Sequence, residues 1–235
     1  MAVSEAVARH ARDVEGIPGL RVIENGVDLS RFGPHRGSDG RRVLAVGRRT
    51  AQKGFDVLVQ ALPPGFTLDI AGEGPWTVAH PQVRLLGRRE DIPALMAGAD
   101  ILAVPSRWEG FGLAAAEGLA AGIPVVASDV DGLAEVVGDA GLLVPPEDPI
   151  ALRSAIEVLG HTPALRRALG ERGKARAAAH FDLSRTVTRY EALYRELVAD
   201  GARTRTRRLT RMFAPRPGWA IMSRDGDPAE PGSGR

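Results

Sequence analysis

The fold of this chain is decided by one stretch, ILAVPSRWEGFGLAAAE at residues 101–117. It passes from a short apolar run through a glycine-bearing loop into a longer segment rich in alanine and leucine. This order is typical of one strand-to-helix unit in a parallel sheet that is buried on both faces. Open sheets of this type bind ligands outside the carboxyl ends of their strands, so the loop at 105–112 is expected at a ligand-binding edge.

The same alternation extends over most of the chain and predicts an α/β fold with a parallel sheet. Strands are expected at 21–24, 42–47, 67–71, 83–86, 101–105, 124–128 and 141–144. Helices are expected at 3–14, 55–61, 91–97, 113–121, 133–137, 150–159, 163–179 and 183–199. Pro149 and Pro163 each follow a polar residue and stand at the first position of an expected helix, where proline is favoured.

The composition is that of an ordinary globular protein with one domain. The chain has 235 residues, of which 44% are hydrophobic and 26% are charged. The absence of cysteine excludes disulfides, a thiol nucleophile and a cysteine-ligated metal site. No segment reaches the roughly 20 apolar residues of a membrane helix, and the first 14 residues lack the apolar centre of a secretory signal. We therefore expect a soluble, cytoplasmic protein.

The charge is unevenly distributed. Of 31 Lys and Arg and 29 Asp and Glu, the segment 199–235 holds eight Arg and four acidic residues, which leaves 23 and 25 for the body. A slightly acidic body argues against nucleic acid as a partner. Residues 200–235 are expected to form a basic, disordered tail. The arginines between 203 and 211 are either solvated chain or a contact with an anionic membrane surface.

Two carboxylates flank the glycine loop. Glu117 is the only charge on the expected helix 113–121, and a buried carboxylate needs a partner, either ligand hydroxyls or an internal arginine. Glu109 precedes Gly110 and Gly112, which allow backbone amides to approach an anion at the helix N-terminus. The plain alternative is that these glycines only form a turn.

Two cations follow the expected strand 42–47. Arg48 and Lys53 near a helix start suit a diphosphate, although Arg and Lys in a loop are more often simply solvated. Arg49, between them, has no evident task.

The pair of glutamates, eight positions apart around a glycine loop, resembles the Glu-(seven residues)-Glu signature of retaining GT-B glycosyltransferases of the group 1 or family 4 type. The resemblance covers about residues 1–198. The supporting motifs occur in the family's order: NGVD at 25–28, VGR at 46–48 with Lys53-Gly54, GEGP at 72–75, LG at 86–87 and DVDGLAE at 129–135.

This resemblance implies the C-terminal half of a GT-B enzyme, a single Rossmann-like parallel sheet with helices on both faces. It also implies the roles of the site residues. Glu109 is the expected catalytic residue, and the expected donor-binding residues are Arg48 and Lys53 at the diphosphate, Glu117 at the ribose, Gly110, Phe111, Gly112 and Leu113 at the sugar and distal phosphate, and Gly87 and Arg88 near the nucleobase. No cofactor or metal is implied, because the cations and helix amides can stabilise the leaving diphosphate.

The chain departs from the family at its start. MAVSEAV at 1–7 resembles the last stretch of the first domain, so we expect residues 1–18 to be a remnant of that domain and of the crossover, and 19–199 to be the nucleotide-sugar-binding domain. The expected function is retaining transfer from a nucleoside diphosphate sugar, inactive without a separate acceptor-domain protein. The alternative is a truncated or nonenzymatic nucleotide-sugar-binding module. In either case an apolar face of the last helix is expected to be exposed.

Overall fold

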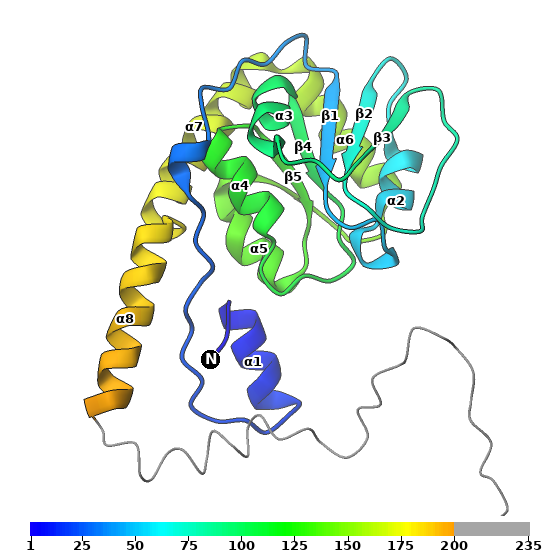
Figure 1. The fold of residues 1–235 in the computed structure, drawn as a ribbon. Coiled ribbons are helices and arrows are strands. Elements are labelled where there is room, and N and C mark those ends of the chain that lie inside the picture. The colour runs from blue at the N-terminus through cyan, green and yellow to red at the C-terminus, as the bar shows by residue number, and fades with distance from the viewer. Residues whose placement is uncertain (200–235) are drawn as a thin grey trace, which may run out of the picture. The chain divides into compact units, whose positions relative to one another are not determined.

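A computed structural model describes residues 1–199 and contains a six-stranded sheet in which every neighbouring pair is parallel (Figure 1). The strand order is β3-β2-β1-β4-β5-β6. The strands are β1 (Arg42–Val46), β2 (Thr67–Ala71), β3 (Val83–Gly87), β4 (Ile101–Val104), β5 (Val125–Ser128) and β6 (Gly141–Val144). The expected α/β class and parallel sheet are confirmed.

Helices connect the strands and continue past the last one. They are α1 (Glu5–Asp13), α2 (Phe55–Ala61), α3 (Ile92–Gly98), α4 (Leu113–Ala121), α5 (Asp131–Val137), α6 (Pro149–His161), α7 (Pro163–His180) and α8 (Leu183–Ala199). Short 3-10 helices lie at Leu29–Arg31, Ala51–Lys53 and Gly138–Ala140. Residues Met1–Glu191 form one compact unit, and a second unit begins at Ala192 within α8.

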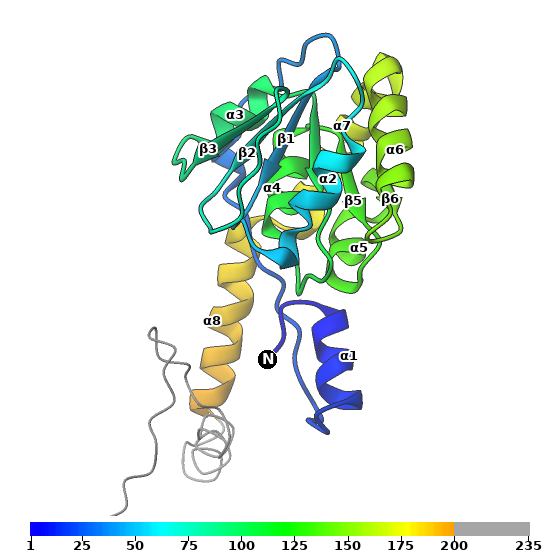
Figure 2. The same cartoon turned by 90° about the vertical axis from the view of Figure 1, so that its right-hand side faces the viewer.

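Successive strand residues point to opposite faces of the sheet, and helices pack against the apolar residues on each face, so both faces are buried. Leu44 and Leu102 pack into one apolar cluster with α4 and α5. Val43 and Ile101, their neighbours in sequence, pack into a second cluster with α2 and α6. Figure 2 shows these two helix layers on opposite sides of the strands. The expectation of helices on both faces is therefore confirmed.

The strand order reverses at β1. From β1 the chain first adds β2 and β3 on one side, then crosses to add β4, β5 and β6 on the other. A reversal of this kind opens a crevice at the carboxyl ends of the two strands that flank it, here β1 and β4. The segments that leave this crevice carry the residues at 48–53 and 106–112 that the sequence singles out.

The predicted strand at 21–24 is wrong. Val22 forms only an isolated parallel bridge with Ala2, held by hydrogen bonds of 2.9 Å from Ala2 N to Arg21 O and from Ile23 N to Ala2 O. The segment lacks the continuous neighbour that a strand requires, since the chain turns into α1 directly after the bridge. The other predicted ends either coincide with the observed ends or differ from them by one or two residues. The expected tail at 200–235 lies outside the described residues.

Within residues 1–199, no helix combines the length and the apolar character needed to cross a membrane. Of the residues on which the predicted apolar face of the last helix rests, Tyr194 is exposed and Tyr190, Leu193 and Leu197 are half-buried. Leu183 and Val187 on the same helix are exposed as well.

Candidate functional site

Lys53 and Glu109 meet at the crevice between β1 and β4. Their Nζ and Oε2 atoms are 2.5 Å apart, and Ser106 Oγ donates a hydrogen bond of 3.2 Å to the same carboxylate oxygen. The side chains are only 17% and 13% exposed, so the pair is shielded from bulk water. The sequence predicts that both residues belong to the site, but it does not predict that they bind each other.

The two loops are brought together by backbone contacts. Gly54 has φ of 62°, and a Cβ atom at this position would lie 2.0 Å from the carbonyl oxygen of Pro105. The amide of Arg107 donates to Gln52 O at 2.8 Å, and Gln52 Nε2 donates to Trp108 O at 3.1 Å. The loop after β1 therefore lies directly on the loop after β4.

The N-terminus of α4 follows directly on the loop after β4. Gly112 is the N-cap residue, with φ of 97°, and it has no side chain to bind the first amides of the helix. Such amides carry a partial positive charge and suit an anion. Phe111 is buried and packs edge-on against Phe181 with ring centroids 5.5 Å apart, so it anchors the loop and offers only its backbone. Leu113 is exposed.

Glu117 is half-buried on α4 and forms no hydrogen bond or ion pair within residues 1–199. Burial raises the pKa of its carboxyl, and the attraction of Arg31 partly offsets this effect. Of the two partners that the sequence left open, an internal arginine is therefore not in contact within the described part of the chain. A carboxylate in this state can still accept hydrogen bonds from ligand hydroxyls.

The remaining predicted donor-binding residues lie at the same edge of the sheet. Arg48 follows β1 and is exposed. Gly87 ends β3 with φ of 67° and open space around it, and Arg88 next to it is exposed. Because β2 lies between β3 and β1 in the sheet, Gly87 and Arg88 are separated from Lys53 and Glu109 along the edge formed by the carboxyl ends of the strands.

Arg49 has a structural task that the sequence did not reveal. Its Nε and NH1 donate hydrogen bonds of 3.1 and 2.6 Å to the carbonyl oxygens of Gly72 and Trp76. These bonds attach the loop after β2 to the loop after β1. The GEGP motif at 72–75 is thus the partner of Arg49, which explains why a glycine is needed at Gly74, where a Cβ would lie 2.5 Å from Arg49 O.

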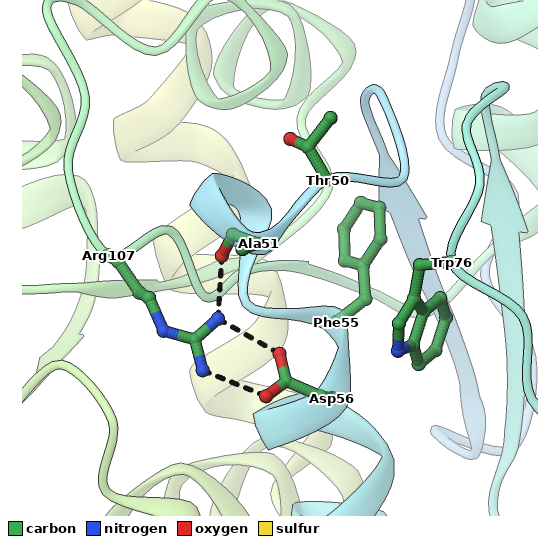
Figure 3. A pocket seen from close by; sticks show the side chains of 6 residues that line it. All are labelled: Thr50, Ala51, Phe55, Asp56, Trp76 and Arg107. Atoms are coloured by element: carbon green, nitrogen blue, oxygen red, sulfur yellow. Dashed lines mark hydrogen bonds and ion pairs between the residues drawn. The ribbon is translucent and has the colours of Figure 1, made fainter. Parts of the chain in front are cut away.

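Sequence reasoning also missed Arg107. Its guanidinium binds Asp56, Glu147 and the carbonyl oxygen of Ala51, so a single side chain links three loops. Figure 3 shows the contacts with Asp56 and Ala51 beside a pocket of about 210 Å³. Only its position between Ser106 and Glu109 could have drawn attention to it in the sequence.

A larger hollow of about 510 Å³ adjoins Glu109. It is lined by Ala6, Val7, His10, Arg107, Trp108, Glu109, Gly110, Asp129, Val130 and Asp131. The N-terminal segment forms one of its walls, because Ser4 Oγ donates to Gly110 O at 2.7 Å and Arg9 pairs with Glu135 on α5 at 3.0 Å. In residues 1–199, no three His, Asp or Glu side chains are grouped to hold a metal ion. That the chemistry needs no metal stays a prediction.

Comparison with known proteins places this site in a family. The model of the family described as glycosyl transferases group 1 matches residues 40–161, which include the loops after β1 and β4. Glycogen synthase of Mycobacterium tuberculosis is 33% identical over 202 residues, which cover 76% of this chain and 49% of the relative. D-inositol 3-phosphate glycosyltransferase of Salinispora tropica is 37% identical over 227 residues, covering 77% and 47%. The chain thus spans about half the length of the curated relatives it matches.

Two solved structures have the same architecture. Sucrose-phosphate synthase from Thermosynechococcus elongatus superposes with a TM-score of 0.77 at 31% identity, over 85% of this chain and 58% of that one. Anabaena HepE in complex with UDP-glucose superposes with a TM-score of 0.77 at 25% identity, over 83% and 63%. These neighbours confirm the Rossmann-like GT-B arrangement of the sheet.

Proposed function

The chain belongs to the group 1 glycosyl transferases, and on that basis we propose that the crevice between β1 and β4 binds the donor, a nucleoside diphosphate sugar. One observation carries the proposal: Lys53 and Glu109 meet beside the uncapped N-terminus of α4. A cation and helix amides that face the same crevice suit a diphosphate. HepE, a structural neighbour, was solved with UDP-glucose.

The residue roles follow from the positions of the side chains. Lys53 exchanges the carboxylate of Glu109 for a phosphate oxygen when the donor binds, and Arg48 adds a second cation. Glu117, which lacks a partner in residues 1–199, accepts hydrogen bonds from the ribose hydroxyls. Glu109, once released by Lys53, faces the sugar together with the backbone from Gly110 to Leu113. Gly87 and Arg88 border the base.

The reaction is transfer with retention. The bond between the anomeric carbon and the diphosphate oxygen breaks, a hydroxyl oxygen of the acceptor bonds to the same face of that carbon, and the hydroxyl proton passes to the leaving diphosphate oxygen. Negative charge grows on the leaving diphosphate, where Lys53, Arg48 and the amides of α4 stabilise it in a shielded site. This stabilisation is the part of catalysis that residues 1–199 carry.

Transfer also requires an acceptor site. Because the chain spans about half the length of the curated relatives it matches, we propose that an acceptor-binding domain, carried by the same protein or by a separate one, completes the site. The second candidate is a nonenzymatic module that binds nucleotide sugars. The two differ in a single respect, since only the first turns over donor when a partner domain and an acceptor are added.

The direct test is calorimetric titration of the chain with UDP-glucose, UDP-N-acetylglucosamine, GDP-mannose and ADP-glucose. We expect one base to bind at least tenfold more tightly than the others. If none of the four binds at millimolar concentration, the donor site is disproved. Retention is then checked by NMR of the anomeric proton of the product formed with that donor and the partner domain. A product with inverted configuration would contradict the proposed stereochemistry and would not affect the proposed donor site.

A further inference from the structure

Arg107 makes more polar contacts than any side chain described so far. Its Nε donates to Glu147 Oε1 at 2.8 Å, and NH1 donates to Ala51 O at 2.6 Å. NH1 and NH2 also bind the two oxygens of Asp56 at 3.0 and 2.8 Å, which is the two-pronged geometry that a guanidinium forms best (Figure 3). These bonds join the loops after β1, β4 and β6.

The contacts of Arg107 lie immediately beside the ion pair in sequence. Ala51 and Gln52 precede Lys53, and Arg107 itself is two residues before Glu109. Gln52 is fixed as well, because its carbonyl oxygen accepts the amide of Arg107 and its side chain donates to Trp108 O. Both members of the ion pair therefore follow backbone that Arg107 holds.

These contacts differ in how far they are shielded from water. The Arg107 side chain is 21% exposed, whereas its partners Asp56 and Glu147 are 41% and 62% exposed, so the bidentate bond to Asp56 is better shielded than the bond to Glu147. The bond from Arg107 is the largest influence on Asp56 and lowers the pKa of that carboxyl. Glu147 is the single non-glycine residue in the described chain with a left-handed backbone, at φ of 59°. A loop held in such a conformation needs an external tether, and Arg107 supplies one.

We propose that Arg107 is a positioning residue for the donor site: by clamping Ala51 and Asp56 to the loop after β4, it places the Lys53 ammonium where the diphosphate binds. Arg107 does not itself contact the donor in this account, because four of its five N–H groups are engaged by protein oxygens. The inference rests on the proposed function, since it concerns the same diphosphate site.

The test measures how much the diphosphate adds to binding. UDP and uridine, GDP and guanosine, and ADP and adenosine are titrated into the wild-type chain and the Arg107→Met variant, and the affinity ratio of diphosphate to nucleoside is taken for the base that binds. Methionine keeps much of the volume and makes none of the hydrogen bonds. We expect the ratio to fall at least fivefold in Arg107→Met, with nucleoside affinity unchanged. A role in stability alone would lower the melting temperature and leave this ratio intact.

Arg84→Met is the matched control. Arg84 also forms a bidentate pair with an aspartate, Asp69, at 2.7 and 2.6 Å, but it lies on β3 and away from the crevice. The control variant should keep the wild-type ratio. Arg107→Lys should recover only part of the loss, because an ammonium cannot span Asp56, Glu147 and Ala51 together.

The outcomes separate the two proposals. A wild-type chain that binds none of UDP, GDP and ADP more tightly than the matching nucleoside disproves the donor site itself. A wild-type preference that Arg107→Met retains overturns the positioning role alone. If Arg107→Met shows no cooperative melting, Asp56→Asn is measured instead. It removes the charge that Arg107 binds, and a ratio lowered less than twofold in that variant likewise overturns the inference.

Discussion

The ion pair between Lys53 and Glu109 defines the resting state of the site. Two side chains that each have a proposed task toward the donor are bound to each other at 2.5 Å. In the proposed exchange, donor binding breaks this pair, and the diphosphate replaces a carboxylate that is already in place. Part of the attraction between Lys53 and the phosphates is thus offset by the loss of Glu109.

Glu109→Gln is expected to separate binding from chemistry. A neutral amide holds Lys53 less strongly than a carboxylate does, so nucleoside diphosphate affinity should rise, by up to about tenfold on the scale of one charge-assisted hydrogen bond. Sugar transfer with the partner domain should be lost. Calorimetry with UDP or GDP checks the first result, and Glu90→Gln, an exposed change of the same charge, is the control. Weaker binding in Glu109→Gln would contradict the exchange.

The effect of Glu117 ionisation on the stability of the fold can be tested by varying the pH. Its folded-state pKa is raised above the ordinary value of 4.5, so the unfolded chain releases this proton at a lower pH than the folded chain. Ionisation of Glu117 therefore costs stability as the pH rises from about 4.5 to the raised pKa, and the cost persists above it. Glu117→Gln should then melt at a higher temperature than the wild type at pH 7.5, with the difference vanishing toward pH 4.

The same variant should bind nucleotide more weakly, by about tenfold, because an amide is a poorer acceptor for two ribose hydroxyls. Melting with and without UDP or GDP separates the two effects. Lower stability of Glu117→Gln without ligand at pH 7.5 would instead point to an internal partner for the carboxylate.

At the level of single residues, the sequence named the candidates Lys53, Glu109 and Glu117 and gave no sign of the bond between the first two. Glu109 and Glu117 stand out because they flank a glycine loop at a strand-to-helix junction, and Lys53 because it follows a buried strand near a helix start. The tasks of Arg49 and Arg107 could not be predicted, because their partners are carbonyl oxygens and carboxylates from loops that only the folded sheet brings together. No spacing in the sequence encodes those contacts.

Among the elements, the loop after β1 is the one on which the site depends most. Gly54 both adopts a left-handed backbone and lies against Pro105 O, so it has two separate reasons to be glycine. The first concerns strain within the residue. The second concerns the distance between the two loops that carry Lys53 and Glu109.

Gly54→Ala and Gly16→Ala distinguish these reasons. The two glycines have nearly equal φ angles, 62° and 65°, but a Cβ on Gly16 meets nothing within 4 Å. Both variants bear the left-handed strain, and only Gly54→Ala must push the loops apart. We expect it to lose about 1–3 kcal/mol more free energy of unfolding than Gly16→Ala, measured with urea. Equal losses would show that the loops are not in close contact.

Most elements were predictable because a strand buried on both faces and an Ala-rich helix leave clear patterns. The strand β2, together with α2 and α4, begins and ends where the sequence indicates. The exception at 21–24 has a physical cause. A β-branched run predicts extended chain, but a strand also needs a neighbour, and here only Ala2 is available.

On the scale of the molecule, the described chain carries the proposed donor site and no identified acceptor site. Positioning two reactants together can lower a barrier by roughly 7–11 kcal/mol. The purified 235-residue chain, given donor and an acceptor library, should therefore show no acceptor-dependent release of nucleoside diphosphate near about 1 per second, a rate within the usual enzyme range. Turnover at that rate would show that the chain needs no partner domain.

A second expectation at this scale concerns association. Leu183 and Val187 on α8 are exposed, and neighbouring apolar side chains on one helix face favour contact with another protein surface. Sedimentation of the wild type and of a Leu183→Ser, Val187→Ser variant checks it. Self-association should weaken in the variant, and a wild-type chain that stays monomeric at about 100 μM would contradict the expectation.

The most direct test of the account is the affinity gained from the diphosphate at Lys53. The nucleoside diphosphate and the nucleoside of the base that binds, whether uracil, guanine or adenine, are titrated into the wild type and into Lys53→Ala at the same ionic strength. We expect the wild type to bind the diphosphate about tenfold more tightly than the nucleoside, and Lys53→Ala to lose most of that difference. Equal affinities for nucleoside and diphosphate in the wild type, or an undiminished difference in Lys53→Ala, would contradict it.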